Sequence, residues 1–289
     1  MPPEDRYADR LRYEPGRLVR QIDEPITVGN ILWVFTDPHR GYEFSYNRWY
    51  ERDHYYAGCM IGAADFAGSR WVATHRHKEA RLAHAKSWPF EPTDGSYACV
   101  YYILGGAFDE WLPWATDQVR RLYDADRGFA HRTHYNTAMY DYEWRAYRDA
   151  DPVPLELALD RRFGGLIAQF VEPAEASDPE AVDRWFDETL PEWLPGSSVA
   201  NVSSWALHAG GVADDVPVPI PGDANAADRK LQLYFVEGDP LASWEQQRQL
   251  VSALEGSGVG RAVITMPFIP TVIGTDQYID ELWAGPVSW

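Results

Sequence analysis

The sequence contains one pattern twice. Residues 31–38 (ILWVFTDP) reappear in similar form at 166–173 (LIAQFVEP), an offset of 135 positions. Residues 47–54 (NRWYERDH) correspond to 183–190 (DRWFDETL) at an offset of 136. An offset of 133 relates three further pairs: Tyr101 and Tyr234, Gly105 and Gly238, Trp111 and Trp244. Because the order is kept and the offset drifts by only three residues, we predict a tandem duplication.

A chain of 289 residues suits two domains of about 120 residues each better than one. We expect an N-terminal arm at 1–26, a first unit at 27–148, a linker at 149–162 and a second unit at 163–289. Hydrophobic runs and turn residues predict the order strand, helix, strand, strand, helix, strand in each unit. The expected elements of the first unit are 30–36, 41–56, 66–74, 97–104, 108–123 and 131–142. Those of the second are 166–171, 179–193, 199–207, 231–236, 243–254 and 261–268.

This βαββαβ order predicts an α+β fold of the ferredoxin-like kind, an antiparallel four-stranded sheet with both helices on one face. One such unit leaves the other face of its sheet bare. Two units that pack their bare faces together bury both, which explains why the unit occurs twice. We therefore expect two tandem ferredoxin-like units packed against each other within one chain.

Composition excludes several classes of function. The chain carries a net charge of −18 and no run rich in Lys and Arg, so a nucleic-acid partner is not expected. Its first 20 residues are charged and lack an apolar stretch, and no segment reaches the ~20 apolar residues of a membrane helix. We expect a cytoplasmic protein with two reduced cysteines. The 13 Trp, 17 Tyr and 11 Phe indicate either a ring-lined ligand pocket or an aromatic-rich core.

The segment 46–54 (YNRWYERDH) follows the first expected strand and resembles the dimeric α/β-barrel superfamily. It is most similar to EthD-like proteins, whose first helix carries a Trp-Tyr-acid-x-x-His pattern. The resemblance implies that the usual homodimer is fused here into an intramolecular dimeric α/β barrel, a pseudo-dimer. The superfamily includes cofactor-free monooxygenases, lactone isomerases, polyketide cyclases, dehydratases, lyases and haem enzymes. This chain departs from the pattern at Leu190, where the second unit lacks the histidine, and in an extra loop at 75–96.

The histidines are distributed unequally, since seven of the eight lie in the first unit, at 39, 54, 75, 77, 84, 131 and 134. His54 is the leading candidate for a general acid or base. We expect it at the C-terminal end of the first helix, where the helix dipole would raise its proton affinity. The alternative is a capping histidine that packs against Tyr55 or Tyr56.

Two further histidines, His131 and His134, flank the start of the last strand of the first unit. Their expected counterparts, Ile264 and Pro267, are inert. On a regular strand they face opposite sides, so at most one of them faces a pocket; the alternative is an exposed strand end. Further candidates to contact a substrate are Trp33, Tyr50, Tyr102, Arg132 and Tyr135.

His75 and His77 have a metal-ligand spacing, because on a strand both rings would share one face, with His84 within reach. The surrounding charged residues favour instead a solvated exit from the strand. We expect no metal there, with His75 and His77 as the weak alternative.

These observations, with the resemblance, predict a functional pocket in the first unit. The expected function is a cofactor-independent enzyme that moves protons on a small aromatic, lactone or polyketide-like molecule, as an isomerase, lyase, dehydratase or cyclase. His54 would be the acid/base, with Tyr50 and either His131 or His134 orienting the substrate. Two alternatives stay open: a haem-dependent, iron-dependent or cofactor-free oxygenase, and a non-enzymatic binding protein for a hydrophobic metabolite. The expected assembly is a monomer or a homodimer of pseudo-dimers.

Overall fold

The structure is a computed structural model that describes residues 12–21, 26–84, 88–174, 178–209 and 228–285. The main elements of the first unit are β1 (Val28–Pro38), α1 (Glu43–Trp49), β2 (Asp65–Val72), β4 (Tyr97–Leu104), α3 (Phe108–Asp124) and β5 (Arg132–Tyr147). Those of the second are β6 (Gly165–Pro173), α4 (Pro179–Trp193), β7 (Val199–Leu207), β8 (Lys230–Val236), α5 (Trp244–Ser257) and β9 (Gly260–Pro270). Short 3₁₀ turns in the described ranges include Leu155–Leu157, Leu194–Gly196 and Pro240–Ser243. Each unit thus has the expected βαββαβ order.

Two features of the first unit differ from the expectation. The first helix does not end near residue 56 but continues from α1 as a π-helix over Tyr50–Met60. The expected loop at 75–96 contains a short helix, α2 (His75–Glu79), and a two-residue strand, β3 (Leu82–Ala83), which pairs with β9.

The strands form one closed antiparallel barrel. Their order is β2-β4-β1-β5-β7-β8-β6-β9, and β2 also pairs with β9 through Trp71 opposite Pro270 and Val72 opposite Ile269. Each unit contributes four consecutive strands in the ferredoxin-like order. The last strand of each unit pairs with the second strand of the other unit. The expected fold class, two tandem ferredoxin-like units packed as an intramolecular dimeric α/β barrel, is confirmed.

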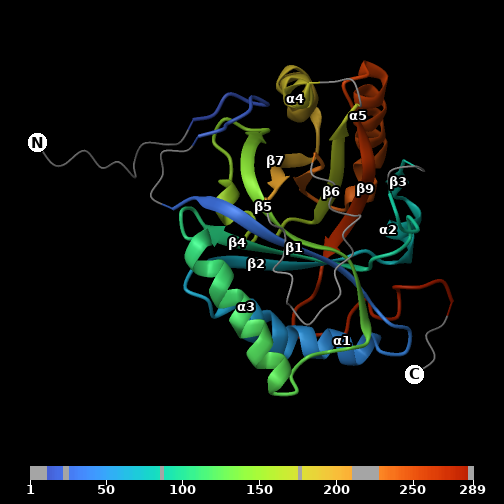
Figure 1. The fold of residues 1–289 in the computed structure, drawn as a ribbon. Coiled ribbons are helices and arrows are strands. Elements are labelled where there is room, and N and C mark those ends of the chain that lie inside the picture. Colours follow the sequence, from blue (N-terminus) through green and yellow to red (C-terminus); the bar gives the residue numbers. More distant parts are fainter. Residues whose placement is uncertain (1–11, 22–25, 85–87, 175–177, 210–227, 286–289) are drawn as a thin grey trace, which may run out of the picture.

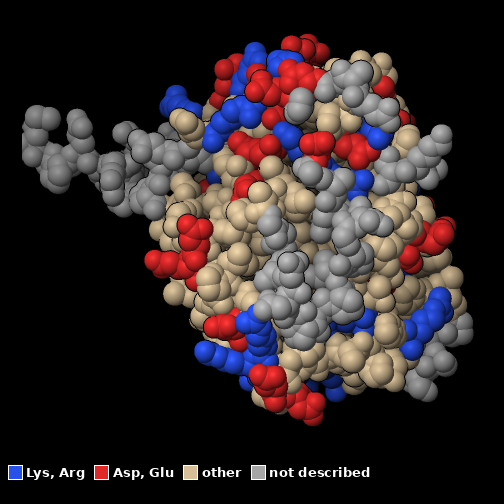
Figure 2. Space-filling view, viewed as in Figure 1, with Lys and Arg blue, Asp and Glu red and all other residues tan. Residues whose placement is uncertain are grey.

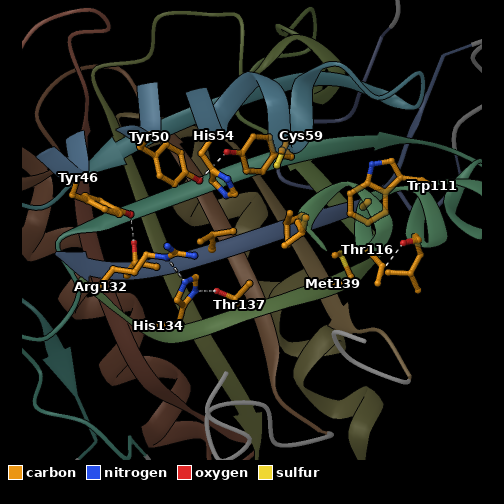
Figure 3. Close-up of a pocket in the computed structure, with 18 residues that line it drawn as sticks. Tyr46, Tyr50, His54, Cys59, Trp111, Thr116, Arg132, His134, Thr137 and Met139 are labelled. Carbon is orange, nitrogen blue, oxygen red and sulfur yellow. Dashed lines mark hydrogen bonds between the residues drawn. The ribbon is translucent and has the colours of Figure 1, made fainter. Parts of the chain in front are cut away.

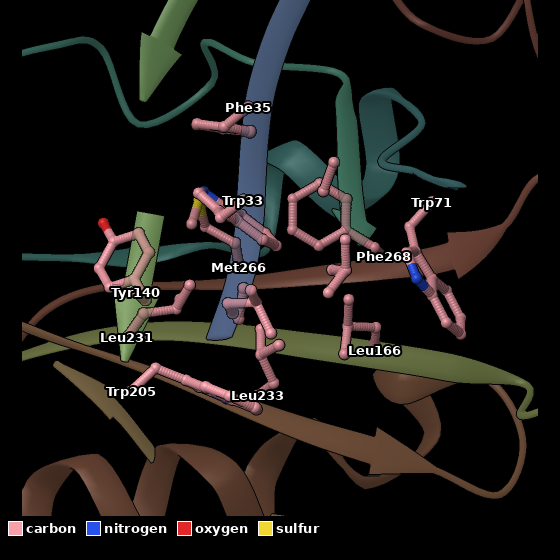
Figure 4. Close-up of a cluster of buried hydrophobic side chains, with 14 of the residues drawn as sticks. Trp33, Phe35, Trp71, Tyr140, Leu166, Trp205, Leu231, Leu233, Met266 and Phe268 are labelled. Carbon is pink, nitrogen blue, oxygen red and sulfur yellow. The ribbon is translucent and has the colours of Figure 1, made fainter. Parts of the chain in front are cut away.

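The barrel interior is filled by a single hydrophobic core to which both units contribute (Figure 4). Trp33 and Phe35 from β1 pack against Phe268 from β9, with ring centroids 6.4 and 6.0 Å apart. Trp205 from β7 and Met266 from β9 are fully buried in the same cluster. The two bare sheet faces are therefore buried against each other, as their apolar character requires.

The helices cover the outer faces of the barrel. Figure 1 shows α1 and α3 against the sheet of the first unit, and α4 and α5 against that of the second, on the opposite side. The start of α4 is fixed by Asp178, whose side chain accepts a hydrogen bond from the backbone N–H of Glu180, with Pro179 at the first helical position. Among the described residues no helix is long and apolar enough to cross a membrane.

Segments outside the barrel tie the units together. After β9, the chain crosses to the first unit, where Asp276 forms an ion pair with Arg48 of α1 at 2.8 Å and Thr275 O accepts a hydrogen bond from Asn47. In the expected arm at 1–26, Val19 bridges to Arg145 of β5, while residues 1–11 and 22–25 lie outside the described ranges. On the face seen in Figure 2, acidic and basic side chains are intermixed over the second unit.

Candidate functional site

A cavity of about 100 Å³ lies in the first unit, between the outer face of its sheet and the two helical segments that cover it. It is mostly apolar. Its lining residues are Leu32, Val34, Thr36, Tyr46, Tyr50, His54, Gly58, Cys59, Tyr101, Trp111, Leu112, Ala115, Thr116, Val119, Arg132, His134, Thr137 and Met139. Figure 3 shows Tyr46, Tyr50 and His54 on the helix side, facing Arg132 and His134 on the sheet side. The cavity is therefore distinct from the filled interior of the barrel.

Strand alternation decides which residues of β1 reach the cavity. Leu32, Val34 and Thr36 line it. Trp33 and Phe35, which alternate with them, point into the barrel core. The expectation that Trp33 contacts a substrate is therefore wrong, because its side chain lies on the opposite face of the sheet from the cavity.

A β-bulge in β5 aims two polar residues at the cavity. Phe35 pairs with Asn136, but the next residue, Thr36, pairs with His134, so Tyr135 is an extra residue in the ladder. A bulge of this kind shifts the side-chain alternation by one position. As a result His134 and Thr137, three residues apart, both line the cavity. Tyr135 instead packs on Phe35 in the barrel, with ring centroids 5.8 Å apart.

Arg132 and His134 form a hydrogen-bonded pair on the sheet side. Arg132 Nε donates to His134 Nε2 at 2.8 Å, and His134 Nδ1 lies 2.7 Å from Thr137 Oγ1. Because Nε2 accepts a hydrogen bond, His134 is neutral with its proton on Nδ1, which donates to Thr137. Burial and the charge of Arg132 agree with this assignment, since they lower the pKa of His134 to about 3.

Arg132 is itself held from several sides. It also donates to Tyr123 Oη at 2.8 Å and to the carbonyl oxygen of Phe129. Its guanidinium lies over the ring of Trp49, 4.8 Å from the centroid. The site therefore contains one fixed positive charge against a mostly apolar cavity.

His54 reaches the cavity from the middle of the π-helix. Its ring stacks on Trp49, with centroids 4.4 Å apart, and makes a T-shaped contact with Tyr50 at 5.4 Å. Gly58, four residues on, leaves room for the ring, because a Cβ atom there would lie 3.0 Å from His54 Nδ1 and Cε1. A π-helix is often found at a functional site.

The protonation of His54 differs from the expectation. Burial, followed by the charge of Arg132, lowers the pKa of His54 to about 3. The expected increase from a helix C-terminus is wrong, since the helical backbone continues to Met60. The capping alternative does not apply either, because His54 stacks on Trp49 and makes a T-shaped contact with Tyr50, not with Tyr55 or Tyr56. The imidazole is neutral at physiological pH.

The tyrosines of the cavity are paired with other hydroxyl groups. Tyr50 Oη lies 2.8 Å from Tyr101 Oη, and Tyr46 Oη lies 2.7 Å from Thr36 Oγ1. Burial raises the pKa of Tyr50 well above its ordinary value and that of Tyr46 to about 12. Both therefore remain protonated. Tyr50 lines the cavity as predicted from the sequence, but its hydroxyl is already hydrogen-bonded within the protein.

The corresponding space in the second unit is filled. Strand register and the helix alignment make Phe186, Leu190, Leu194 and Ala262 the counterparts of Tyr50, His54, Gly58 and His134. The first three are fully buried in one hydrophobic cluster with Val182 and Tyr234. The expected counterparts of His131 and His134 are therefore wrong. By strand register Ile264 is the counterpart of Asn136, and Pro267 is the counterpart of Met139.

The structure thus brings together four of the predicted residues, His54, Tyr50, His134 and Arg132, around one cavity. It does not bring the others there. His131 is exposed and stacks on Tyr42 with a centroid distance of 3.7 Å. Tyr102 is fully buried in the barrel core, as Trp33 is.

His75 and His77 do not form the metal site that their spacing would allow on a strand, because both lie on the helix α2. The His75 side chain is 42% exposed, whereas that of His77 is fully buried, with Nδ1 2.8 Å from Thr74 Oγ1. Within the described ranges no group of three or more His, Cys, Asp or Glu side chains is placed to hold a metal ion.

Sequence reasoning missed most of the apolar wall and the residue that opens the cavity. Gly58 stands where the second unit has Leu194, a difference that the repeat alignment contains. Strand alternation places Tyr101 and Tyr102 on opposite faces of the sheet. Tyr101 lines the cavity and Tyr102 does not. No signal in the sequence pointed to Thr137, because its position depends on the bulge at Tyr135.

A larger polar pocket of about 610 Å³ lies in the second unit. Its charged groups are paired with one another: Lys230 Nζ lies 3.0 Å from Asp183 and 2.8 Å from Glu143, and Arg229 lies 3.1 Å from Glu172. These ion pairs occupy most of the charged groups that line the pocket. The cavity around His54 is therefore the better candidate for a functional site.

Haem does not fit the cavity around His54. An engineered cavity of about 150 Å³ accommodates benzene, and this one measures about 100 Å³. A tetrapyrrole is several times larger than one benzene ring. Of the two histidines there, His134 uses both ring nitrogens within the protein, which leaves only His54 as a possible axial ligand.

No family model and no curated protein matches the sequence. Solved structures with a similar arrangement include an anthrone oxidase-like protein (8% identity, TM-score 0.48, covering 90% of this chain and 98% of that one). A variant of DypB from Rhodococcus jostii in complex with heme gives 9% identity, TM-score 0.48 and coverages of 91% and 97%. A heme-binding protein from Thermus thermophilus has 12% identity and a TM-score of 0.43, and the match covers 90% of this chain and 98% of that one. Likenesses at this level do not assign an activity. The strand order of this chain defines a single-chain dimeric α/β barrel. Its first unit contains a mostly apolar site.

Proposed function

We propose that the chain is a cofactor-independent enzyme that catalyses proton transfer on a small, mostly apolar molecule, with His54 as the acid/base. The reaction would be of the isomerase, lyase, dehydratase or cyclase type. One observation carries the proposal: the first unit holds an open cavity around a neutral histidine, whereas Leu190 and Leu194 fill the equivalent space in the second unit.

The electrostatics of the cavity suit the removal of a proton from a weak acid. In the reaction, a C–H or O–H bond of the substrate breaks, the proton goes to a nitrogen of His54, and the electron pair stays on the substrate as an enolate or phenolate. Arg132 supplies a fixed positive charge that stabilises the anion in an apolar setting. The anion in turn favours the imidazolium, so the pKa of His54 rises from about 3 as charge develops.

The return of the proton completes the reaction. An imidazolium with a low pKa gives its proton back readily, either to another atom of the enolate or to a leaving group. His134 is a positioning residue here, because it accepts the hydrogen bond from Arg132 Nε. Tyr50 makes a T-shaped contact with His54 and limits its movement.

The test is hydrogen–deuterium exchange at carbon, followed by proton NMR in D₂O. Cyclohexanone and cyclohex-2-enone are suitable probes, since each is a single six-membered ring with one oxygen and an acidic C–H next to the carbonyl. We expect the protein to accelerate exchange above the buffer rate. His54→Phe should reduce that acceleration by roughly 10²–10⁴-fold, while His131→Phe, at the exposed residue just before β5, should leave it unchanged. Equal acceleration by wild type and His54→Phe would remove the basis of the proposal.

The same measurements separate the alternatives. A binding protein for a hydrophobic metabolite would bind the probes without any exchange. Haem or iron would appear as a visible absorption band of the purified protein and as iron in elemental analysis. A cofactor-free oxygenase would consume dioxygen with the substrate, which an oxygen electrode measures directly.

A further inference from the structure

The polar groups of the cavity around His54 are unequally available to a ligand. All of its hydroxyl, guanidinium and indole groups are hydrogen-bonded to protein atoms: Thr36 with Tyr46, Tyr50 with Tyr101, Arg132 and Thr137 with His134, Thr116 with Leu112 O, and Trp111 with Asp65. His54 is different, because its ring makes stacking contacts but neither ring nitrogen is hydrogen-bonded to the described residues. The side chain is half-buried, and neither nitrogen is among the buried polar atoms that lack a partner, so the ring keeps hydrogen-bonding capacity that a molecule in the cavity can use. His54 is thus the group that a ligand can satisfy.

Apart from the Cys59 thiol, which is hydrogen-bonded to Tyr101, the remaining wall offers only apolar contact. Its side chains come from β1, α3 and β5, and they are Leu32, Val34, Leu112, Ala115, Val119 and Met139. A second polar atom on a ligand, placed against this wall, would lose its water and gain no hydrogen bond.

The volume sets the size of the ligand. A cavity of about 150 Å³ takes up benzene, and this one measures about 100 Å³. One six-membered ring that extends slightly towards the opening is therefore the largest body it encloses. A fused ring system, such as a polyketide-like substrate, exceeds it.

We infer that the site accepts a single six-membered ring that carries one hydrogen-bonding oxygen, with the oxygen directed at His54 and the rest of the ring apolar. This narrows the substrate class of the proposed function and rests on it for the role of His54. It also removes fused-ring molecules from the substrates expected from the sequence.

The selectivity can be measured by calorimetry with four probes: phenol, toluene, hydroquinone and 1-naphthol. Phenol and toluene have nearly the same shape, so their difference reports the hydrogen bond to His54. We expect phenol to bind roughly three- to tenfold more tightly than toluene. Hydroquinone should bind roughly tenfold more weakly than phenol, since its second hydroxyl is buried without a partner. For 1-naphthol, which has a second ring, no measurable binding is expected.

Two variants make the test specific. His54→Phe keeps a ring that can stack on Trp49 but removes both nitrogens, so phenol and toluene should bind equally. If that variant does not fold, His54→Leu replaces it, because the second unit carries Leu190 at this position. Gly58→Leu introduces the residue of the second unit into the cavity and should abolish binding of both probes, with folding verified by circular dichroism.

The outcomes distinguish this inference from the proposed function. Binding of 1-naphthol as tight as that of phenol would overturn the size limit. A preference for phenol that persists in His54→Phe would overturn the role of His54 in recognition. Neither result depends on catalysis. If the predicted selectivity is found but no deuterium exchange occurs, the proton-transfer function is overturned while the inferred class of ligand stands.

Discussion

His54→Leu should make the protein less sensitive to acid. The folded protein holds His54 in an apolar cavity beside Arg132, which lowers the pKa of this group from an ordinary value of 6.5 to about 3. The unfolded chain therefore binds a proton at His54 at pH values where the folded protein does not. Between these two pKa values the free energy of unfolding falls as the pH falls. The stability associated with the neutral ring is fully present above pH 6.5 and is lost progressively towards pH ~3.

The size of the effect follows from the pKa difference. One pKa unit corresponds to about 1.36 kcal/mol. A pH of about 5 is roughly 1.5 units below the pKa of His54 in the unfolded chain. Protonation of His54 in the unfolded chain therefore lowers the free energy of unfolding by about 2 kcal/mol relative to pH ~7.5. His134, with its pKa also lowered to about 3, contributes a similar amount that remains in the variant.

Urea unfolding at both pH values, followed by tryptophan fluorescence, measures the effect. For each protein the free energy at pH ~5 is subtracted from that at pH ~7.5, so any change that leucine makes in packing cancels. We expect this difference to be about 2 kcal/mol smaller in His54→Leu than in wild type. His131→Leu, at the exposed residue just before β5, is the matched control and should behave as wild type. An unchanged difference in His54→Leu would refute the assignment of a neutral imidazole with a lowered pKa.

Two further substitutions test the geometry. Gly58→Ala places a Cβ atom 3.0 Å from His54 Nδ1 and Cε1. We expect the imidazole ring to move, which NMR detects as changed chemical shifts, and the preference for phenol over toluene to fall. Unchanged shifts and an unchanged preference would show that Gly58 does not make room for the ring. Trp33→Ala should lower the free energy of unfolding by about 3–5 kcal/mol because Trp33 is fully buried in the barrel, but phenol affinity should stay the same; a large loss of affinity would show that the barrel core and the cavity are coupled.

The repeat pattern allowed the architecture to be predicted because each strand and helix carries its own local signal. The range 97–104 and the helix 179–193 agree with the structure at both ends. The π-helix over Tyr50–Met60 could not be foreseen in this way, since its wider hydrogen-bond pattern has no distinct hydrophobic period. The helix was therefore expected to end near residue 56, and the effect of its C-terminus on His54 was inferred with the wrong sign.

The site was predicted less completely because it depends on which face of each strand a residue occupies. Comparison of the two units identified Trp33 by its loss in the second unit, where Ala168 stands. That comparison reports a difference in volume and not a direction, and both residues lie in the barrel core. The side chains of β5 are a harder case, because the extra residue Tyr135 reverses the alternation between His134 and Thr137.

The bulge by itself does not make the site, since both units have it. In β9, Val263 is the extra residue, as Tyr135 is in β5. The backbone that could present a polar group to the space under the helices is therefore shared, and the side chains decide its use. In the second unit the helical segment carries the large Leu190 and Leu194, and the strand carries the small Ala262. The first unit reverses this distribution: the strand carries the larger His134, the helix carries Gly58, and the volume left over is the cavity that His54 faces.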